Sequence, residues 1–132
     1  MNTPMLNQAG RAQARPISGH WVIAFKCVFI AAVLLVTHES LIPVGNNSVS
    51  NNWDKLVHFI AYFVLSVMAL FAFPHARLLW IVMWLTILGI GIEIAQALMP
   101  FGRSGSFADG VANMLGTLLP AGLWQLYNRV KT

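Results

Sequence analysis

Four long apolar runs, separated by short polar segments, dominate the chain. They cover residues 21–37, 54–73, 78–99 and 107–127, and each is close to the roughly 20 residues that a helix needs to cross a bilayer. The break after residue 73 is so short that the helices on either side of it must run antiparallel. The pattern predicts an all-α, polytopic membrane protein with four transmembrane helices in a compact antiparallel bundle.

Residues 1–20 differ from the rest of the chain, because they are polar and contain Arg11 and Arg15 without any acidic residue. Pro16 and other proline and glycine residues in this stretch oppose a stable helix. We therefore expect a flexible basic tail at 1–20 and a single membrane domain at 21–132.

The composition agrees with a membrane protein. Of 132 residues, 58% are hydrophobic and only 9% are charged, against about 25% in an ordinary soluble domain. The net charge of +4 does not indicate a nucleic-acid partner, because the basic residues are dispersed at the ends of the apolar runs. Cys27 is the single cysteine, so the sequence indicates no disulfide framework and no cysteine-based metal motif. We expect no cofactor, and the oligomeric state stays open.

Lysine and arginine residues near the ends of the spans predict the orientation, because cytoplasmic loops carry an excess of both. Lys55 and Arg103 fall on one side of the four-span arrangement. The other six basic residues fall on the opposite side: Arg11, Arg15, Lys26, Arg77, Arg129 and Lys131. Both termini are therefore expected in the cytoplasm, and all four acidic residues lie towards the outer side.

Polar side chains recur at helical spacing near the expected outer ends of three spans. A carboxylate inside an apolar span costs at least about 2.5 kcal/mol, so these positions call for an explanation. Residues three or four apart share one helical face, which brings the polar positions of three helices to one depth. The sequence predicts a shared outward-facing pocket formed by Asp54, His58, Tyr62, Glu93, Gln96, Asp109 and Asn113.

Several of these residues also have a purely structural interpretation. Asp54 is also suited to capping the second helix, and Ser106 followed by Asp109 is a variant capping box at the start of the fourth. His58 and Tyr62 also fit as interior packing residues with satisfied polar atoms. A structural role for Glu93 requires a partner such as Arg103, His58 or Asn113.

The same residues resemble the VanZ-like family of small bacterial integral membrane proteins, named after a protein associated with resistance to the glycopeptide antibiotic teicoplanin. The resemblance covers about 53–122 and rests on 54–59 (Asp-Lys-Leu-Val-His-Phe) with Tyr62, Glu93 to Gln96, Arg103, and 109–113 (Asp-Gly-Val-Ala-Asn) with Gly116. It implies a setting in the bacterial inner membrane and cell envelope. A link to envelope stress or glycopeptide resistance is a hypothesis beside it, because the resemblance does not by itself make the chain a resistance factor.

The first functional hypothesis is a site that binds or modifies an amphiphilic anionic molecule, such as a lipid, an isoprenoid-linked precursor or a lipid-tailed glycopeptide antibiotic. Lys55 and Arg103 would hold its phosphate or carboxylate, while the other ligand-binding residues would orient it: Tyr62, Gln96, Asp109 and Asn113. An enzymatic version uses His58, oriented by Asp54, as general base and Glu93 as acid or second base. The sequence leaves open whether any reaction is catalysed.

Two alternatives belong to other classes of function. One is a metal site formed by His58, Glu93 and Asp109, although a single histidine is poor zinc spacing. The other is an assembly or interaction subunit whose buried ion pairs fix helix packing without a small ligand.

Overall fold

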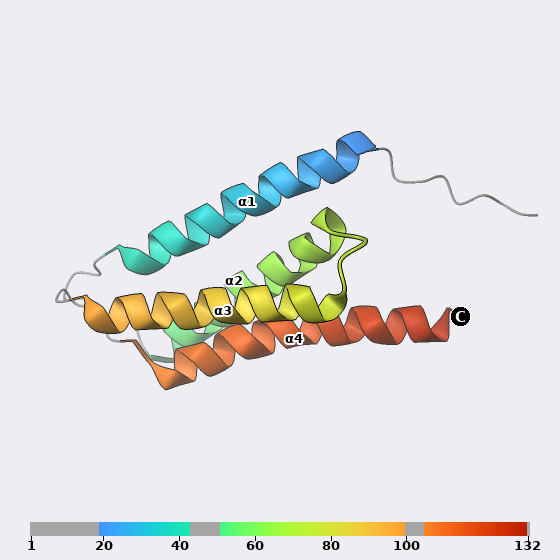
Figure 1. Ribbon diagram of the computed structural model, residues 1–132. Coiled ribbons are helices and arrows are strands. Elements are labelled where there is room, and N and C mark those ends of the chain that lie inside the picture. The colour runs from blue at the N-terminus through green and yellow to red at the C-terminus, as the bar shows by residue number, and fades with distance from the viewer. Residues whose placement is uncertain (1–18, 43–50, 100–104, 132) are drawn as a thin grey trace, which may run out of the picture.

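The computed structural model describes residues 19–42, 51–99 and 105–131, and these residues form four helices (Figure 1). The helices are α1 (Gly19–Leu41), α2 (Asn51–Ala72), α3 (Leu78–Leu98) and α4 (Phe107–Val130). The all-helical prediction is confirmed, although α1 extends past residue 37 and α2 begins before residue 54. The tail expected at 1–20 lies almost wholly outside the described residues, and so does Arg103.

Three of the described helices are long and apolar enough to cross a membrane, with mean hydropathies of 2.1 for Gly19–Leu41, 1.9 for Asn52–Ala72 and 2.2 for Leu78–Leu98. α4 is not among them, because it carries Asp109, Asn113 and several glycines. The polar side chains of its first half are nevertheless turned inward. The buried positions of α4 are Asp109, Ala112, Asn113, Gly116, Thr117, Pro120 and Ala121.

The beginnings of α2 and α4 lie at the same end of the molecule as the ends of α1 and α3 (Figure 1). α2 packs most extensively against α4, while α1 rests mainly on α2 and has no buried residue. This arrangement brings the polar ends of all four helices together.

Small residues allow α2 and α4 to approach closely. Gly116 lies against the backbone of Phe59 and Phe63, leaving no room for a Cβ atom. One turn further along, the Ser66 hydroxyl donates a hydrogen bond to the carbonyl oxygen of Thr117 at 2.9 Å, and both side chains are fully buried. Small residues and hydrogen bonds of this kind hold helices together where lipid removes the hydrophobic drive for association. The contact fixes the register of the two helices that supply most of the polar cluster.

The apolar core occupies the other half of the bundle. Leu65, Ala69 and Leu70 of α2 pack against Ile81 and Leu85 of α3. Large apolar side chains cover the outer surface of every helix, as a lipid-facing surface requires. The polar groups at the opposite end therefore stand out against an otherwise apolar bundle.

Candidate functional site

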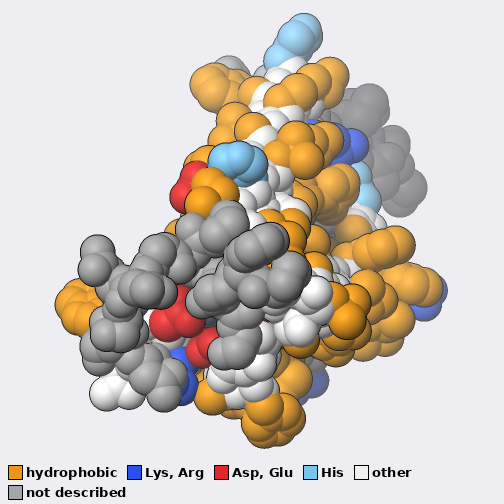
Figure 2. Space-filling view, turned by 90° about the vertical axis from the view of Figure 1, so that its left-hand side faces the viewer, with side chains coloured by type: hydrophobic (Ala, Val, Ile, Leu, Met, Phe, Trp, Pro, Cys, Tyr) orange, Lys and Arg blue, Asp and Glu red, His pale blue; other side chains and the backbone are white. Residues whose placement is uncertain are grey.

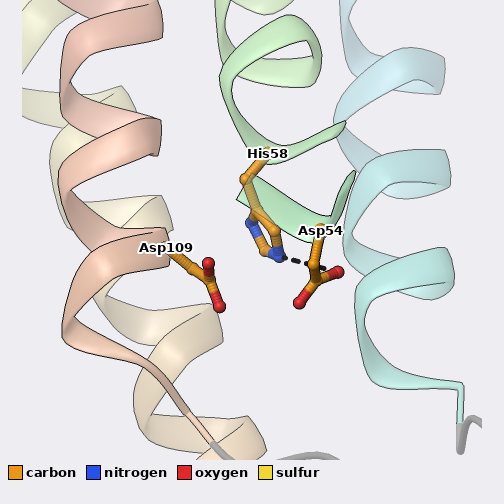
Figure 3. A group of neighbouring side chains, drawn as sticks. All are labelled: Asp54, His58 and Asp109. Carbon is orange, nitrogen blue, oxygen red and sulfur yellow. Dashed lines mark ion pairs between the residues drawn. The ribbon is translucent and has the colours of Figure 1, made fainter. Parts of the chain in front are cut away.

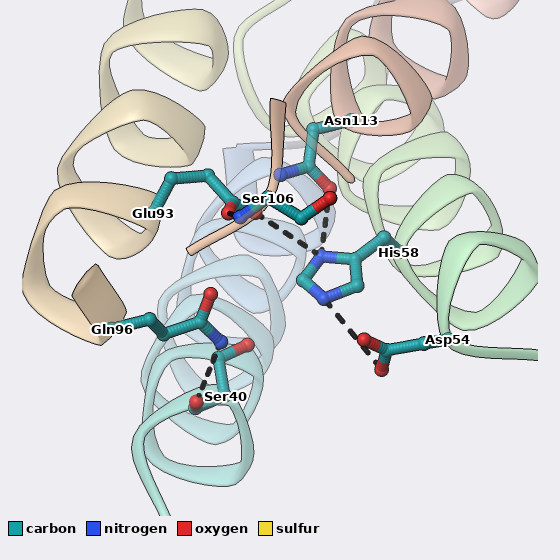
Figure 4. A network of polar contacts seen from close by, with 7 residues as sticks. All are labelled: Ser40, Asp54, His58, Glu93, Gln96, Ser106 and Asn113. Atoms are coloured by element: carbon teal, nitrogen blue, oxygen red, sulfur yellow. Dashed lines mark hydrogen bonds and ion pairs between the residues drawn. The ribbon is translucent and has the colours of Figure 1, made fainter. Parts of the chain in front are cut away.

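His58 lies at the centre of the polar end of the bundle (Figure 4). Its ring is only 6% exposed, and Nδ1 lies 3.1 Å from Oδ1 of Asn113 on α4. Because a carbonyl oxygen can only accept, Nδ1 is the donor in this hydrogen bond. On the other side of the ring, Nε2 lies 4.0 Å from Oδ1 of Asp54, one turn earlier on α2. The predicted stripe on α2 thus meets α4 through the imidazole.

Glu93 joins α3 to the beginning of α4. Its Oε2 accepts a hydrogen bond from the backbone N–H of Ser106 at 2.8 Å, and Ser106 is the residue immediately before α4. Its Oε1 lies 3.9 Å from Nδ1 of His58, and the side chain is 13% exposed. His58 was among the expected partners of Glu93, whereas the backbone of Ser106 was not.

Asp109 faces the other side of the cluster. Asp109 is only 5% exposed. Figure 3 shows its carboxylate directed towards the same space as the side chains of Asp54 and His58. One potential ligand atom from each of these three residues lies within 4.8 Å of the others. Glu93 is not in this group, so the three residues that approach one another differ from the predicted metal set of His58, Glu93 and Asp109.

Several buried polar atoms of the cluster have no hydrogen-bond partner among the described residues. They are Tyr62 Oη, Glu93 Oε1, Asp109 Oδ1 and Asn113 Nδ2. A buried polar atom without a partner costs about 1 to 3 kcal/mol, and native proteins hold few of them. These unpaired atoms are concentrated at the polar end of the bundle, which is the arrangement expected where side chains bind a ligand.

A groove of about 420 Å³ lies between α3 and α4 beside this cluster. Its walls are mostly apolar, with Ile90, Ile94 and Met114 along its length, and its lining also includes Glu93 and Asn113. A smaller cavity of about 210 Å³ between α1 and α2 is lined in part by His58 and Tyr62. Figure 2 looks onto the polar end and shows acidic side chains gathered there beside a basic one.

The structure brings most of the predicted site residues together. Asp54, His58, Glu93 and Asn113 are connected through the imidazole, and Asp109 faces it. The remaining predicted positions differ in their placement. Tyr62 is buried beside Gly89 and Asn113, and Lys55 is half-buried just after the first turn of α2. Gln96 binds α1, and Arg103 lies outside the described residues.

Gln96 plays a part that its position in the sequence did not indicate. Its amide donates a hydrogen bond to the backbone carbonyl of Ser40 at 2.8 Å, which ties the end of α3 to the end of α1. Ser40 was missed as a contributor, since a backbone acceptor carries no sequence signal. Gln96 therefore supports the site by holding α1 against it.

The capping interpretations are only partly matched by the described residues. α2 begins at Asn51, so Asp54 lies in the first turn of the helix and not at its cap. Ser106 does precede α4, but its side chain makes no capping hydrogen bond. Asp109 lies in the first turn of α4 with its carboxylate turned inward. Both aspartates thus lie in the first turn of their helix, next to the cluster.

Fold and site together define a small helical membrane protein with a buried polar cluster at one end of an apolar bundle. Across residues 7–128 the chain matches the VanZ/LLP1 family, and it belongs to that family. The match extends the resemblance, which rested on 53–122, to the first helix. No curated protein and no solved structure matches the chain.

Proposed function

We propose that this VanZ/LLP1 family member is a four-span protein of the bacterial inner membrane, with both termini in the cytoplasm and the polar cluster facing outward. α4 would be the fourth span: its 24 residues reach about 36 Å, against a hydrocarbon core of about 30 Å. The polar residues of its first half are buried, whereas Leu115, Leu119 and Leu123 are exposed. Consecutive spans would run antiparallel, as their grouped polar ends suggest.

The proposed function of the cluster is to bind or modify an amphiphilic anionic molecule of the envelope. The observation that carries this proposal is the groove between α3 and α4, which is apolar along its sides and includes Glu93, Ser106 and Asn113. Ile90 and Ile94 are about half exposed, so the groove opens sideways towards lipid. An acyl or isoprenoid chain would lie along the groove, with its head group at the polar cluster.

The head group would meet both charged and hydrogen-bonding side chains. Lys55, and on sequence grounds Arg103, would supply positive charge, and Asn113 Nδ2 and Tyr62 Oη are buried donors without partners among the described residues. If a reaction occurs, His58 would act as base with Asp54 beside Nε2, and Glu93 as acid. Because Nδ1 donates to Asn113 at 3.1 Å, Nε2 is the nitrogen left to accept a proton, and a proton gained there would lie beside Asp54, whose Oδ1 is 4.0 Å away.

A blocked groove tests the proposal. Ile94→Trp would fill the groove, whereas Ile87→Trp changes a similarly exposed residue, 53% against 55%, that lies two turns away and does not line the groove. Native mass spectrometry of the detergent-purified protein would count bound phosphatidylglycerol. We expect Ile94→Trp to raise the Kd for phosphatidylglycerol about tenfold, equivalent to about 1.4 kcal/mol, and Ile87→Trp to match the unchanged protein. Equal binding by all three proteins would overturn the proposal.

A second candidate is a membrane assembly or interaction subunit in which the buried polar contacts only fix helix packing. The hydrogen bonds from Ser106 to Glu93 and from Gln96 to Ser40 favour it, since both join separate helices. Glu93→Gln distinguishes the two functions because it removes the charge while keeping an acceptor. Loss of phosphatidylglycerol binding or of the cellular phenotype in a folded Glu93→Gln protein would support a site, and full retention would support an assembly role.

A further inference from the structure

We propose that Asp54, His58 and Asp109 bind a single divalent transition-metal ion, such as Zn²⁺ or Mn²⁺, at the polar end of the bundle. This inference goes beyond lipid binding, because the three residues form their own group at the beginnings of α2 and α4. It also differs in composition from the metal set suggested by the sequence, with Asp54 in place of Glu93.

The geometry places three suitable ligand atoms around one space. The atoms lie within 4.8 Å of one another, and Figure 3 shows the side chains converging from two helices. A tetrahedral ion with ligand distances of about 2.0 to 2.2 Å needs ligand atoms roughly 3.3 to 3.6 Å apart. Small rotations of the two carboxylates close this difference, while His58 is held in place.

The imidazole is oriented for metal binding by its other nitrogen. Nδ1 donates its hydrogen to Asn113 Oδ1 at 3.1 Å, which leaves the lone pair of Nε2 directed at the side of the ring where Asp54 lies. Metal-binding histidines almost always donate their second N–H to a carbonyl or carboxylate in this way. Asn113 is therefore a positioning residue for the ligand His58.

The burial of Asp109 is an independent indication that Asp54, His58 and Asp109 bind a ligand. Only 5% of the residue is exposed, and its Oδ1 has no hydrogen-bond partner among the described residues. A buried carboxylate oxygen directed at a second carboxylate and an imidazole nitrogen is favourable when a cation lies between them. The charges of Asp54 and Asp109 together balance those of one divalent ion.

The ligand types and access define the class of ion. Two carboxylates with one imidazole suit Zn²⁺ or Mn²⁺ better than the all-oxygen preference of Mg²⁺ or Ca²⁺. The side chain of Asp54 is 36% exposed, which gives an ion a route from the surface. Three protein ligands leave at least one coordination position for water or for an oxygen of a head group.

Metal titration of the full chain in detergent tests this site without any lipid. After treatment with EDTA, Zn²⁺, Mn²⁺ or Mg²⁺ is added, and isothermal titration calorimetry measures affinity and stoichiometry. We expect about one Zn²⁺ or Mn²⁺ per chain and at least about tenfold weaker binding by Asp109→Asn and by Asp54→Asn. Glu39→Gln is the matched control, because it removes the one acidic residue outside the cluster, an exposed side chain at the end of α1.

A second pair of variants separates this proposal from lipid binding. Asn113→Ala should weaken the ion about 10- to 100-fold through the orientation of His58, and Ile94→Trp should bind the ion normally while losing phosphatidylglycerol. Asp54→Asn keeps the test valid if Asp109→Asn does not fold, since Asp54 is the more exposed aspartate. Absence of stoichiometric binding, or equal binding by Asp54→Asn and Glu39→Gln, would overturn the metal site.

Discussion

The hydrogen bond between Glu93 and Ser106 makes a quantitative prediction about stability. Glu93 lies one and a half turns before the end of α3, and its Oε2 accepts the backbone N–H of the residue that precedes α4 at 2.8 Å. The carboxylate therefore connects the last turns of α3 to the residue that precedes α4. Replacing Glu93 by Ala removes the acceptor and leaves a part-buried N–H without it.

The expected cost follows from the kind of bond removed. A buried donor without a partner costs about 1 to 3 kcal/mol, so Glu93→Ala should lower the free energy of unfolding by about that amount. Glu93→Gln retains a carbonyl oxygen in nearly the same position, and removing the charge relieves repulsion from Asp54 and Asp109. We therefore expect Glu93→Gln to stay within about 1 kcal/mol of the unchanged protein.

Equilibrium unfolding of the detergent-purified protein by added SDS, followed by far-ultraviolet circular dichroism, measures both variants. Glu39→Ala serves as the control, since its carboxylate is 64% exposed. The reasoning is refuted if Glu93→Gln is destabilised as much as Glu93→Ala, or if Glu93→Ala unfolds like the control. In the first case the charge itself would stabilise the fold, and the assembly function would gain support.

Two further predictions concern packing and orientation. Gly116→Ala should destabilise the protein by about 1 to 3 kcal/mol in the same assay, because the new methyl group would collide with the backbone of α2. Gly122→Ala is the control and should be neutral, because a Cβ atom added there meets nothing within 4 Å. Comparable effects of the two substitutions would contradict close α2–α4 packing through glycine. In a Cys27→Ser background, Ser48→Cys and Ser104→Cys should react with a membrane-impermeant maleimide added to cells whose outer membrane has been permeabilised, because both positions are expected on the outer side. Labelling only after the inner membrane is opened would reverse the proposed orientation.

The sequence predicts the helices well because long apolar runs leave the backbone no alternative to internal hydrogen bonding in lipid. It also places the polar residues at one depth, since the four-residue spacing of Asp54 and His58 fixes them on one face of α2. The spacing of Asp109 and Asn113 does the same for α4, where both are buried. These features depend only on local periodicity, which a single sequence contains.

The contacts between helices could not be predicted in the same way. Glu93 binds a backbone N–H, and Gln96 binds a backbone carbonyl on α1, and neither partner is marked by its side chain. The structure groups Asp54, and not Glu93, with His58 and Asp109. This grouping depends on which edge of the imidazole each helix faces. That choice is made by the rotation and register of α2 against α4, which the fit of Gly116 decides.

The negative charges at the polar end favour the binding of a cation over the binding of an anion. Asp54 and Asp109 lie in the first turns of α2 and α4, where each helix dipole offsets about 0.3 to 1 kcal/mol of the cost of a negative charge. Two carboxylates with ligand atoms no more than 4.8 Å apart repel each other by roughly 1 to 3.5 kcal/mol between bulk water and an effective dielectric constant of 20. Helix dipoles therefore offset only part of this repulsion, and Glu93 on the other side of His58 adds a third negative charge. An anionic head group would bind near this cluster only if positive charge offset the carboxylates. A divalent ion on Asp54, His58 and Asp109 would add its charge to that of Lys55 and, on sequence grounds, Arg103, beside the polar part of the groove.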